Sequence, residues 1–143
     1  MYKHLYQVLI ALTLFAGLMV PATQAQSHIL RADIPFDFVV LGTRLHAGEY
    51  HVKQMSPELT LIQSKDARSA AVVLTRAVPA GKISDVGKLV FNRYGDQYFL
   101  SKIWGASSAM GRELPKSRLE REVAKGSSTD GTTLIAAEPV LKK

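Results

Sequence analysis

The segment Gly87-Lys-Leu-Val-Phe-Asn-Arg-Tyr-Gly-Asp-Gln-Tyr-Phe-Leu-Ser-Lys-Ile-Trp104 contains two runs rich in β-branched and aromatic residues, separated by Gly95-Asp96. Such runs favour strands, and a glycine at the first position of a two-residue loop is typical of a type II′ turn. The sequence therefore predicts a β-hairpin. Its short loop also sets the register, which pairs Tyr94 with Gln97, Arg93 with Tyr98 and Phe91 with Leu100.

Side chains alternate between the two faces of a strand, so this register predicts which of them share a face. One face is apolar and should lie in the core; it carries Leu89, Phe91, Tyr98, Leu100 and Trp104. The opposite face mixes Val90, Phe99 and Ile103 with polar residues, and we expect it to be partly covered.

Further strands are predicted on both sides of the hairpin. Residues 29–41 alternate between apolar and polar side chains, which is typical of a half-buried strand, and Pro35 indicates an edge or a bulge there. Residues 70–75 are apolar on both faces and predict a central strand. The other expected strands are residues 45–53, 59–64 and 132–137, with a polar hairpin loop at 65–69.

One helix is expected, near residues 115–125. Ser117 and Glu120 have capping-box spacing, and Leu119 and Val123 form a narrow apolar stripe that should face the sheet. A flexible link follows at residues 126–131. The predicted fold class is therefore all-β: a small antiparallel sandwich or barrel of about six to eight strands with one C-terminal surface helix.

Residues 1–25 have the pattern of a secretory signal peptide, with an apolar run from Val8 to Val20 and cleavage expected after Ala25. A membrane anchor fits less well because the run is too short to span a bilayer. Cleavage would leave residues 26–143 as a single domain of periplasmic or extracellular location, with no transmembrane span. Loss of Lys3 would lower the net charge from +6 to +5.

Several stretches together resemble small exported bacterial proteins of unassigned function. They are Ile34-Pro-Phe-Asp-Phe-Val, Ala47-Gly-Glu-Tyr50, the hairpin residues 88–104, and residues 111–122. The resemblance covers most of the chain after residue 25 and is most specific in the hairpin. It implies export and a β-rich fold, and it supplies no catalytic residues.

The residues that carry chemistry in other proteins do not form a recognised pattern here. The chain has no cysteine, which excludes thiol catalysis and zinc–cysteine sites. We interpret the remaining candidates as solvated or loop residues, so that no catalytic, metal or cofactor site is expected; they are His28, His46, His51, Ser107, Lys82 and the pair Asp33 and Asp37.

The strongest surface signal is basic. Arg112, Lys116, Arg118 and Arg121 lie in and before the expected helix and are the candidate contacts to an anionic surface or envelope polymer. Lys116 and Arg118 have i, i+4 spacing to Glu120 and Glu122. A surface helix with its own ion pairs is therefore the simpler interpretation. The export signal argues against nucleic acid as a partner. The oligomeric state is not indicated.

Three functions follow from these patterns, in order of preference. The first is a non-enzymatic exported β-domain that associates with an envelope or extracellular component. The second is a β-barrel carrier whose interior holds a lipid or another apolar ligand. The third is an enzyme of unknown type.

Overall fold

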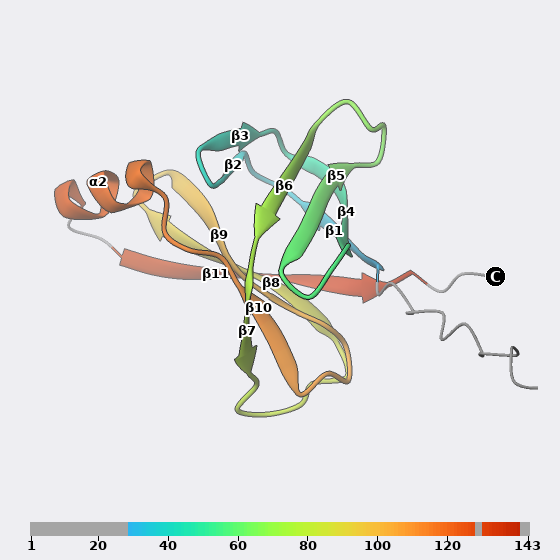
Figure 1. Ribbon diagram of the computed structural model, residues 1–143. Helices are drawn as coiled ribbons and strands as arrows, with labels where there is room; N and C mark the ends of the chain where they lie inside the picture. The colour runs from blue at the N-terminus through green and yellow to red at the C-terminus, as the bar shows by residue number, and fades with distance from the viewer. Residues whose placement is uncertain (1–28, 128–129, 141–143) are drawn as a thin grey trace, which may run out of the picture.

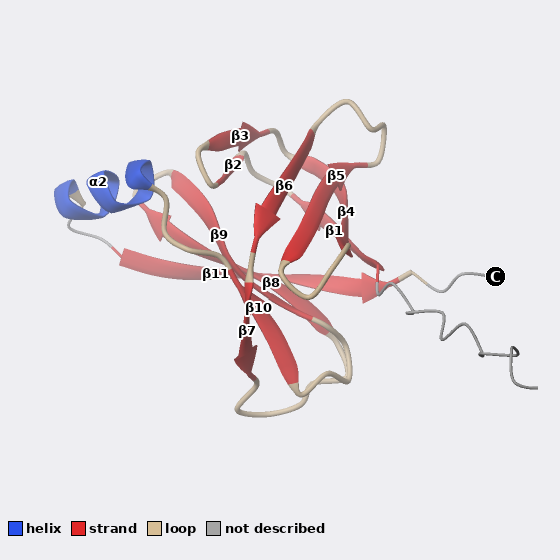
Figure 2. Ribbon diagram, viewed as in Figure 1, coloured by secondary structure: helices blue, strands red, loops and turns tan. Residues whose placement is uncertain are grey.

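The computed structural model describes residues 29–127 and 130–140, which form eleven strands and one helix (Figures 1 and 2). The expected signal peptide, residues 1–25, lies outside the described residues. The strands are β1 (Ile29–Ile34), β2 (Phe38–Val40), β3 (Thr43–Leu45), β4 (Gly48–Gln54), β5 (Leu59–Ser64), β6 (Ala70–Leu74), β7 (Arg76–Pro79), β8 (Gly87–Tyr94), β9 (Gln97–Trp104), β10 (Met110–Glu113) and β11 (Asp130–Pro139); the helix is α2 (Arg118–Gly126).

The strands form one strongly curved sheet that comes close to a barrel (Figure 1). Its main path runs β3-β2-β9-β8-β11-β1-β4-β5-β6, and β10 pairs with both β9 and β7. The chain leaves β6, at one end of this path, passes through Thr75 and enters β7. Strand β7 pairs with β10, in a different part of the sheet. The all-β prediction is thus confirmed in its barrel-like form.

The expected number of six to eight strands is too low for two reasons. The predicted strand 29–41 is interrupted at Pro35, so that β1 pairs with β4 and β11 whereas β2 pairs with β3 and β9. The short strands β3, β7 and β10 also escaped prediction, because three or four residues give too little periodicity. Pro35 marks this break, and β1 itself is not an edge strand, since it has neighbours on both sides.

The β8–β9 hairpin has the predicted register next to its turn, where Tyr94 faces Gln97, Arg93 faces Tyr98 and Phe91 faces Leu100. Gly95 has a φ of +60°, as the first residue of a type II′ turn requires. Beyond Phe91 the prediction is wrong. A β-bulge shifts the pairing there, because Val90 lies opposite Lys102 and leaves Ser101 unpaired with β8.

The bulge exchanges the faces of two residues at the end of β9. Ile103 lies opposite Leu89 and is buried, whereas Trp104 is only partly buried. The Trp104 indole covers Gly111 of β10, where a Cβ atom would overlap its ring. Trp104 thus packs across two neighbouring strands, outside the core in which the sequence placed it.

The core is filled by side chains that several strands of the curved sheet direct inward. Phe91 is fully buried, and its ring contacts those of Phe36 and Phe38 edge to face, with centroids 5.2 and 5.5 Å apart. Phe38 also packs on Tyr50 at 5.1 Å. Such edge-to-face contacts are favourable geometries for aromatic rings. The aromatic side chains therefore occupy the interior at packing distance.

Strand β6 is an edge strand, so the prediction of a central strand at residues 70–75 is wrong. It pairs only with β5 and ends the main path of the sheet. Ala71 and Val73 are buried, as expected for one face, but Val72 and Leu74 are 59% and 62% exposed. Apolar side chains on both faces therefore do not reflect burial on both faces here.

Candidate functional site

The candidate site is the segment from Arg112 to Lys125, which contains the four predicted anion contacts. Arg118 and Arg121 lie on α2, and Lys116 lies just before it. Arg112 lies apart from them on β10, where its Nη1 donates a hydrogen bond to the Pro57 carbonyl at 2.6 Å. The structure therefore brings three of the four residues to the helix and directs the fourth to the β4–β5 loop.

Helix α2 has the predicted cap at Ser117, but it spans Arg118–Gly126 where residues 115–125 were expected, and it docks through a different face. The hydroxyl of Ser117 caps the helix by accepting a hydrogen bond from the Glu120 backbone N–H at 3.1 Å. Leu119, expected to face the sheet, is 43% exposed, and Val123 is partly buried. The buried residue of the helix is Glu120, with 4% of its surface exposed.

Glu120 anchors the helix to the β8–β9 hairpin. Its Oε1 accepts hydrogen bonds from the Asn92 amide at 2.8 Å and from the Tyr94 hydroxyl at 3.4 Å. The Lys116 ammonium lies 3.3 Å from the same hydroxyl and 6.0 Å from the centre of its ring. Phe99 packs against Tyr94, with ring centroids 5.8 Å apart. The helix thus covers the second face of the hairpin, through a polar contact.

This docking leaves mainly positive charge on the outer surface of α2. The side chains of Arg118, Arg121 and Lys125 are exposed, and Glu122 is the exposed carboxylate among them. The Arg118 Nε is 3.0 Å from Glu122, which confirms the predicted i, i+4 pair. Because Glu120 turns inward, the solvent-facing side chains of the helix carry three cations against one anion.

Glu113 lies at the start of the same segment and is also engaged elsewhere. It forms an ion pair with Arg76 of β7 and lies 3.7 Å from the Lys102 ammonium of β9. The hydrogen bond from Arg76 is the main cause that lowers the pKa of this carboxyl, against the opposing effect of desolvation. A lowered pKa contributes stability above the ordinary titration range of a glutamate, and that contribution is lost as the pH falls through the folded-state pKa.

We expect Glu120→Ala to lower the free energy of unfolding by about 1–3 kcal/mol, because it leaves the Asn92 and Tyr94 donors without their buried acceptor. Glu120→Gln keeps an acceptor oxygen and should cost less. The matched control is Glu122→Ala, which removes an exposed i, i+4 pair worth about 0.3–0.5 kcal/mol. Urea denaturation measures all three, and equal losses for Glu120→Ala and Glu122→Ala would contradict the anchoring role.

Three of the residues set aside as solvated, Asp37, His46 and His51, lie in ion pairs at the surface, and His28 lies outside the described residues. His46 Nδ1 and the Ala47 N–H both lie near the Asp37 carboxylate, at 3.3 and 3.0 Å. The backbone hydrogen bond from Ala47 is the first cause that lowers the pKa of Asp37. His51 Nε2 is 3.9 Å from Glu49. Within residues 29–127 and 130–140, no group of three or more metal-ligating side chains comes together.

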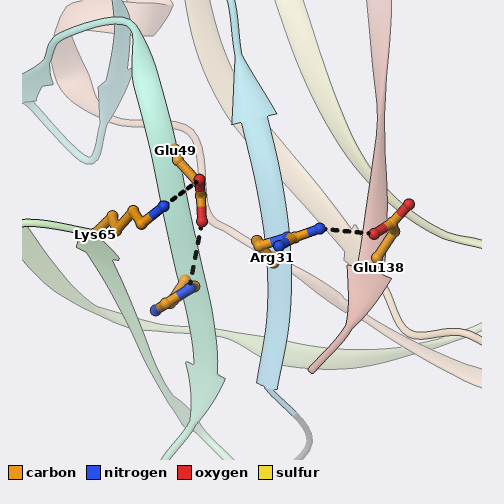
Figure 3. A network of polar contacts seen from close by, with 5 residues as sticks. Arg31, Glu49, Lys65 and Glu138 are labelled. Carbon is orange, nitrogen blue, oxygen red and sulfur yellow. Dashed lines mark hydrogen bonds and ion pairs between the residues drawn. The ribbon is translucent and has the colours of Figure 1, made fainter. Parts of the chain in front are cut away.

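The outer face of β11, β1 and β4 carries two further ion pairs, one of them with Lys65, which follows β5 (Figure 3). Arg31 lies 3.0 Å from Glu138 across β1 and β11, and Lys65 lies 3.1 Å from Glu49. Exposed pairs of this kind contribute at most about 1 kcal/mol each. This face is thus a solvated surface of alternating charge.

Comparison with protein-family models, with curated proteins and with solved structures gave no match to this chain. Among the described residues, no helix has the length and apolar character needed to cross a membrane.

Proposed function

We propose that the chain is a non-catalytic, exported β-domain that associates with an anionic component of the envelope or the extracellular surface. The observation that carries this proposal is the charge separation in α2. The acidic side chain Glu120 is buried against the hairpin, while Arg118, Arg121 and Lys125 remain at the surface. A rigidly docked helix of this kind presents its cations at low entropic cost.

The packing of the interior supports a surface binder over a carrier of apolar ligands. A carrier needs interior volume, whereas Phe36, Phe38 and Phe91 meet at packing distance in the middle of the fold. Leu89 and Ile62 are also fully buried. Among the described residues, no group of three or more side chains is placed to hold a metal ion, so the geometry does not favour a metal-dependent enzyme either.

Replacing both Arg118 and Arg121 by glutamine should weaken binding to vesicles rich in anionic phospholipid by roughly 30-fold, since each basic residue near such a surface contributes about 1 kcal/mol. The melting temperature should hardly change, because only the exposed Arg118–Glu122 pair is lost. Binding of the unaltered protein should also fall steeply with salt, over a screening length of about 8 Å at physiological ionic strength. Vesicle co-sedimentation measures the binding of the variant and its dependence on salt, and thermal unfolding measures the melting temperature.

The matched control replaces Arg31 and Arg68, which lie on β1 and in the β5–β6 loop, by glutamine. This variant loses the same net charge and also loses two exposed ion pairs. It should keep most of the binding. Equal weakening of the two double variants would mean that net charge alone drives binding, and absence of binding at low salt would refute the proposal.

A further inference from the structure

The outer edge of β6 is open. Thr75 N donates to the Glu58 carbonyl at 2.7 Å, and hydrogen-bonded pairs alternate along an antiparallel ladder. Ala71 and Val73 therefore direct their N–H and C=O groups toward β5, in register with Ile62 and Thr60. On the other side of β6 no described strand pairs with it. The backbone groups that face this open edge belong to Ala70, Val72 and Leu74.

The same strand has an apolar outer face. Leu74 lies opposite Leu59 and Val72 lies opposite Leu61, so these four side chains form a continuous apolar strip across β5 and β6. Val72 and Leu74 are 59% and 62% exposed, and Leu59 is 36% exposed. Natural edge strands are commonly blocked by charged residues, proline or bulges. Residues 70–74 of β6 contain no charge and no proline, and their pairing with β5 has no bulge.

The charges at the two ends of β6 indicate the kind of occupant. Arg68, paired with Asp66, precedes the strand and Arg76, paired with Glu113, follows it; both side chains remain largely exposed, at 87% and 78%. If two copies of β6 paired antiparallel about Val72, Arg68 of each copy would face Arg76 of the other. Like charges placed opposite one another are destabilising in a sheet. A second copy of this chain is therefore a poor partner, and a strand with acidic ends is a complementary one.

We propose that the open edge of β6 binds an extended peptide segment of a partner protein, apolar at alternate positions and acidic at both ends, which adds one strand to the sheet. The backbone groups of Ala70, Val72 and Leu74 provide the hydrogen bonds, and the apolar strip receives the alternate side chains of the peptide. Arg68 and Arg76 meet its acidic ends through the exposed parts of their guanidinium groups, beside their pairs with Asp66 and Glu113. This inference goes beyond the anion-binding role proposed for α2 and uses a different surface.

The test uses the protein purified after expression of the full chain and a labelled synthetic peptide. The probe alternates valine and threonine and carries glutamates at both ends; a second probe has lysines in their place. Fluorescence anisotropy should give at least about tenfold tighter binding of the acidic probe, because charge complementarity at an interface discriminates between partners. The same preference should vanish at high salt.

Two matched substitutions locate the binding surface. Leu74→Lys places a charge on the β6 edge, whereas Leu134→Lys makes the same change on β11 at a similar exposure, 58%. Leu74→Lys should weaken binding at least about tenfold and Leu134→Lys should leave it unchanged, with both variants keeping the wild-type circular dichroism spectrum.

Three results would overturn the proposal. The first is no binding of either probe, and the second is equal loss of binding in the two lysine variants. The third is a concentration-dependent dimer in sedimentation experiments that Leu74→Lys abolishes, since the edge would then pair with a second copy.

Discussion

Replacing Phe91 by alanine is expected to lower the free energy of unfolding by about 3–5 kcal/mol, the usual cost of removing a large aromatic side chain from a core. Phe91 is fully buried, and its ring contacts Phe36, in the break between β1 and β2, and Phe38, the first residue of β2. Its loss removes the dispersion contacts with both rings and leaves a cavity that the barrel-like sheet cannot easily close.

Thermal unfolding measures this effect. A loss of 3 kcal/mol should lower the melting temperature by roughly 10 °C or more for a domain of this size. Phe91→Leu retains most of the apolar volume and should cost less than the alanine variant. Leu134→Ala, at a position 58% exposed, should change the stability by no more than about 0.5 kcal/mol. If Phe91→Ala and Leu134→Ala had the same melting temperature, the central role of the Phe91 ring in the core would be refuted.

The hairpin indicates how far sequence patterns reach in this fold. The two-residue turn at Gly95-Asp96 correctly predicts the pairing from Tyr94 back to Phe91. A single extra residue, Ser101, then reverses the faces of Ile103 and Trp104. Nothing in the local alternation marks this bulge, because both of those residues are large and apolar. The outward position of Trp104 depends instead on β10, where Gly111 leaves space for the indole ring.

Strand β6 illustrates the opposite error, in which composition suggests more burial than the fold provides. The apolar residues Val72 and Leu74 indicate a strand covered on both faces, but the position of β6 in the sheet depends on pairings far away in the sequence. The chain leaves β6 at Thr75, whose hydroxyl lies 3.2 Å from that of Thr60, and continues as β7 on another part of the sheet. A buried pair of threonines between two strands has no distinct sequence signature.

The candidate site was predicted only in part, for a related reason. The basic residues Arg118 and Arg121 lie at the surface of α2, as expected. The inward residue is Glu120 instead of Leu119, because Asn92 and Tyr94 supply hydrogen bonds that compensate the burial of a carboxylate. The spacing of Ser117 and Glu120 predicts a cap and gives no information on these distant partners.

Replacing Gly87 by alanine is expected to destabilise the fold by about 1–3 kcal/mol, through overpacking. Gly87 is buried at the start of β8, where β9 and β11 approach it from both sides. A Cβ atom there would lie 2.9 Å from the Ala137 carbonyl oxygen and 3.0 Å from that of Trp104. Both obstacles are backbone atoms of paired strands, so neither can rotate away.

The matched control is Gly131→Ala, on the neighbouring strand β11. A Cβ atom at this exposed position would meet nothing closer than the Arg93 Cβ, at 3.9 Å. Alanine restricts the unfolded chain more than glycine does, so this variant should be neutral or up to about 1 kcal/mol more stable. Urea denaturation of the two variants should therefore give changes in the free energy of unfolding that differ in sign or clearly in size. Equal stability of Gly87→Ala and Gly131→Ala would mean that β9 and β11 can separate around β8, and that the close approach of the three strands is not needed for the barrel-like closure.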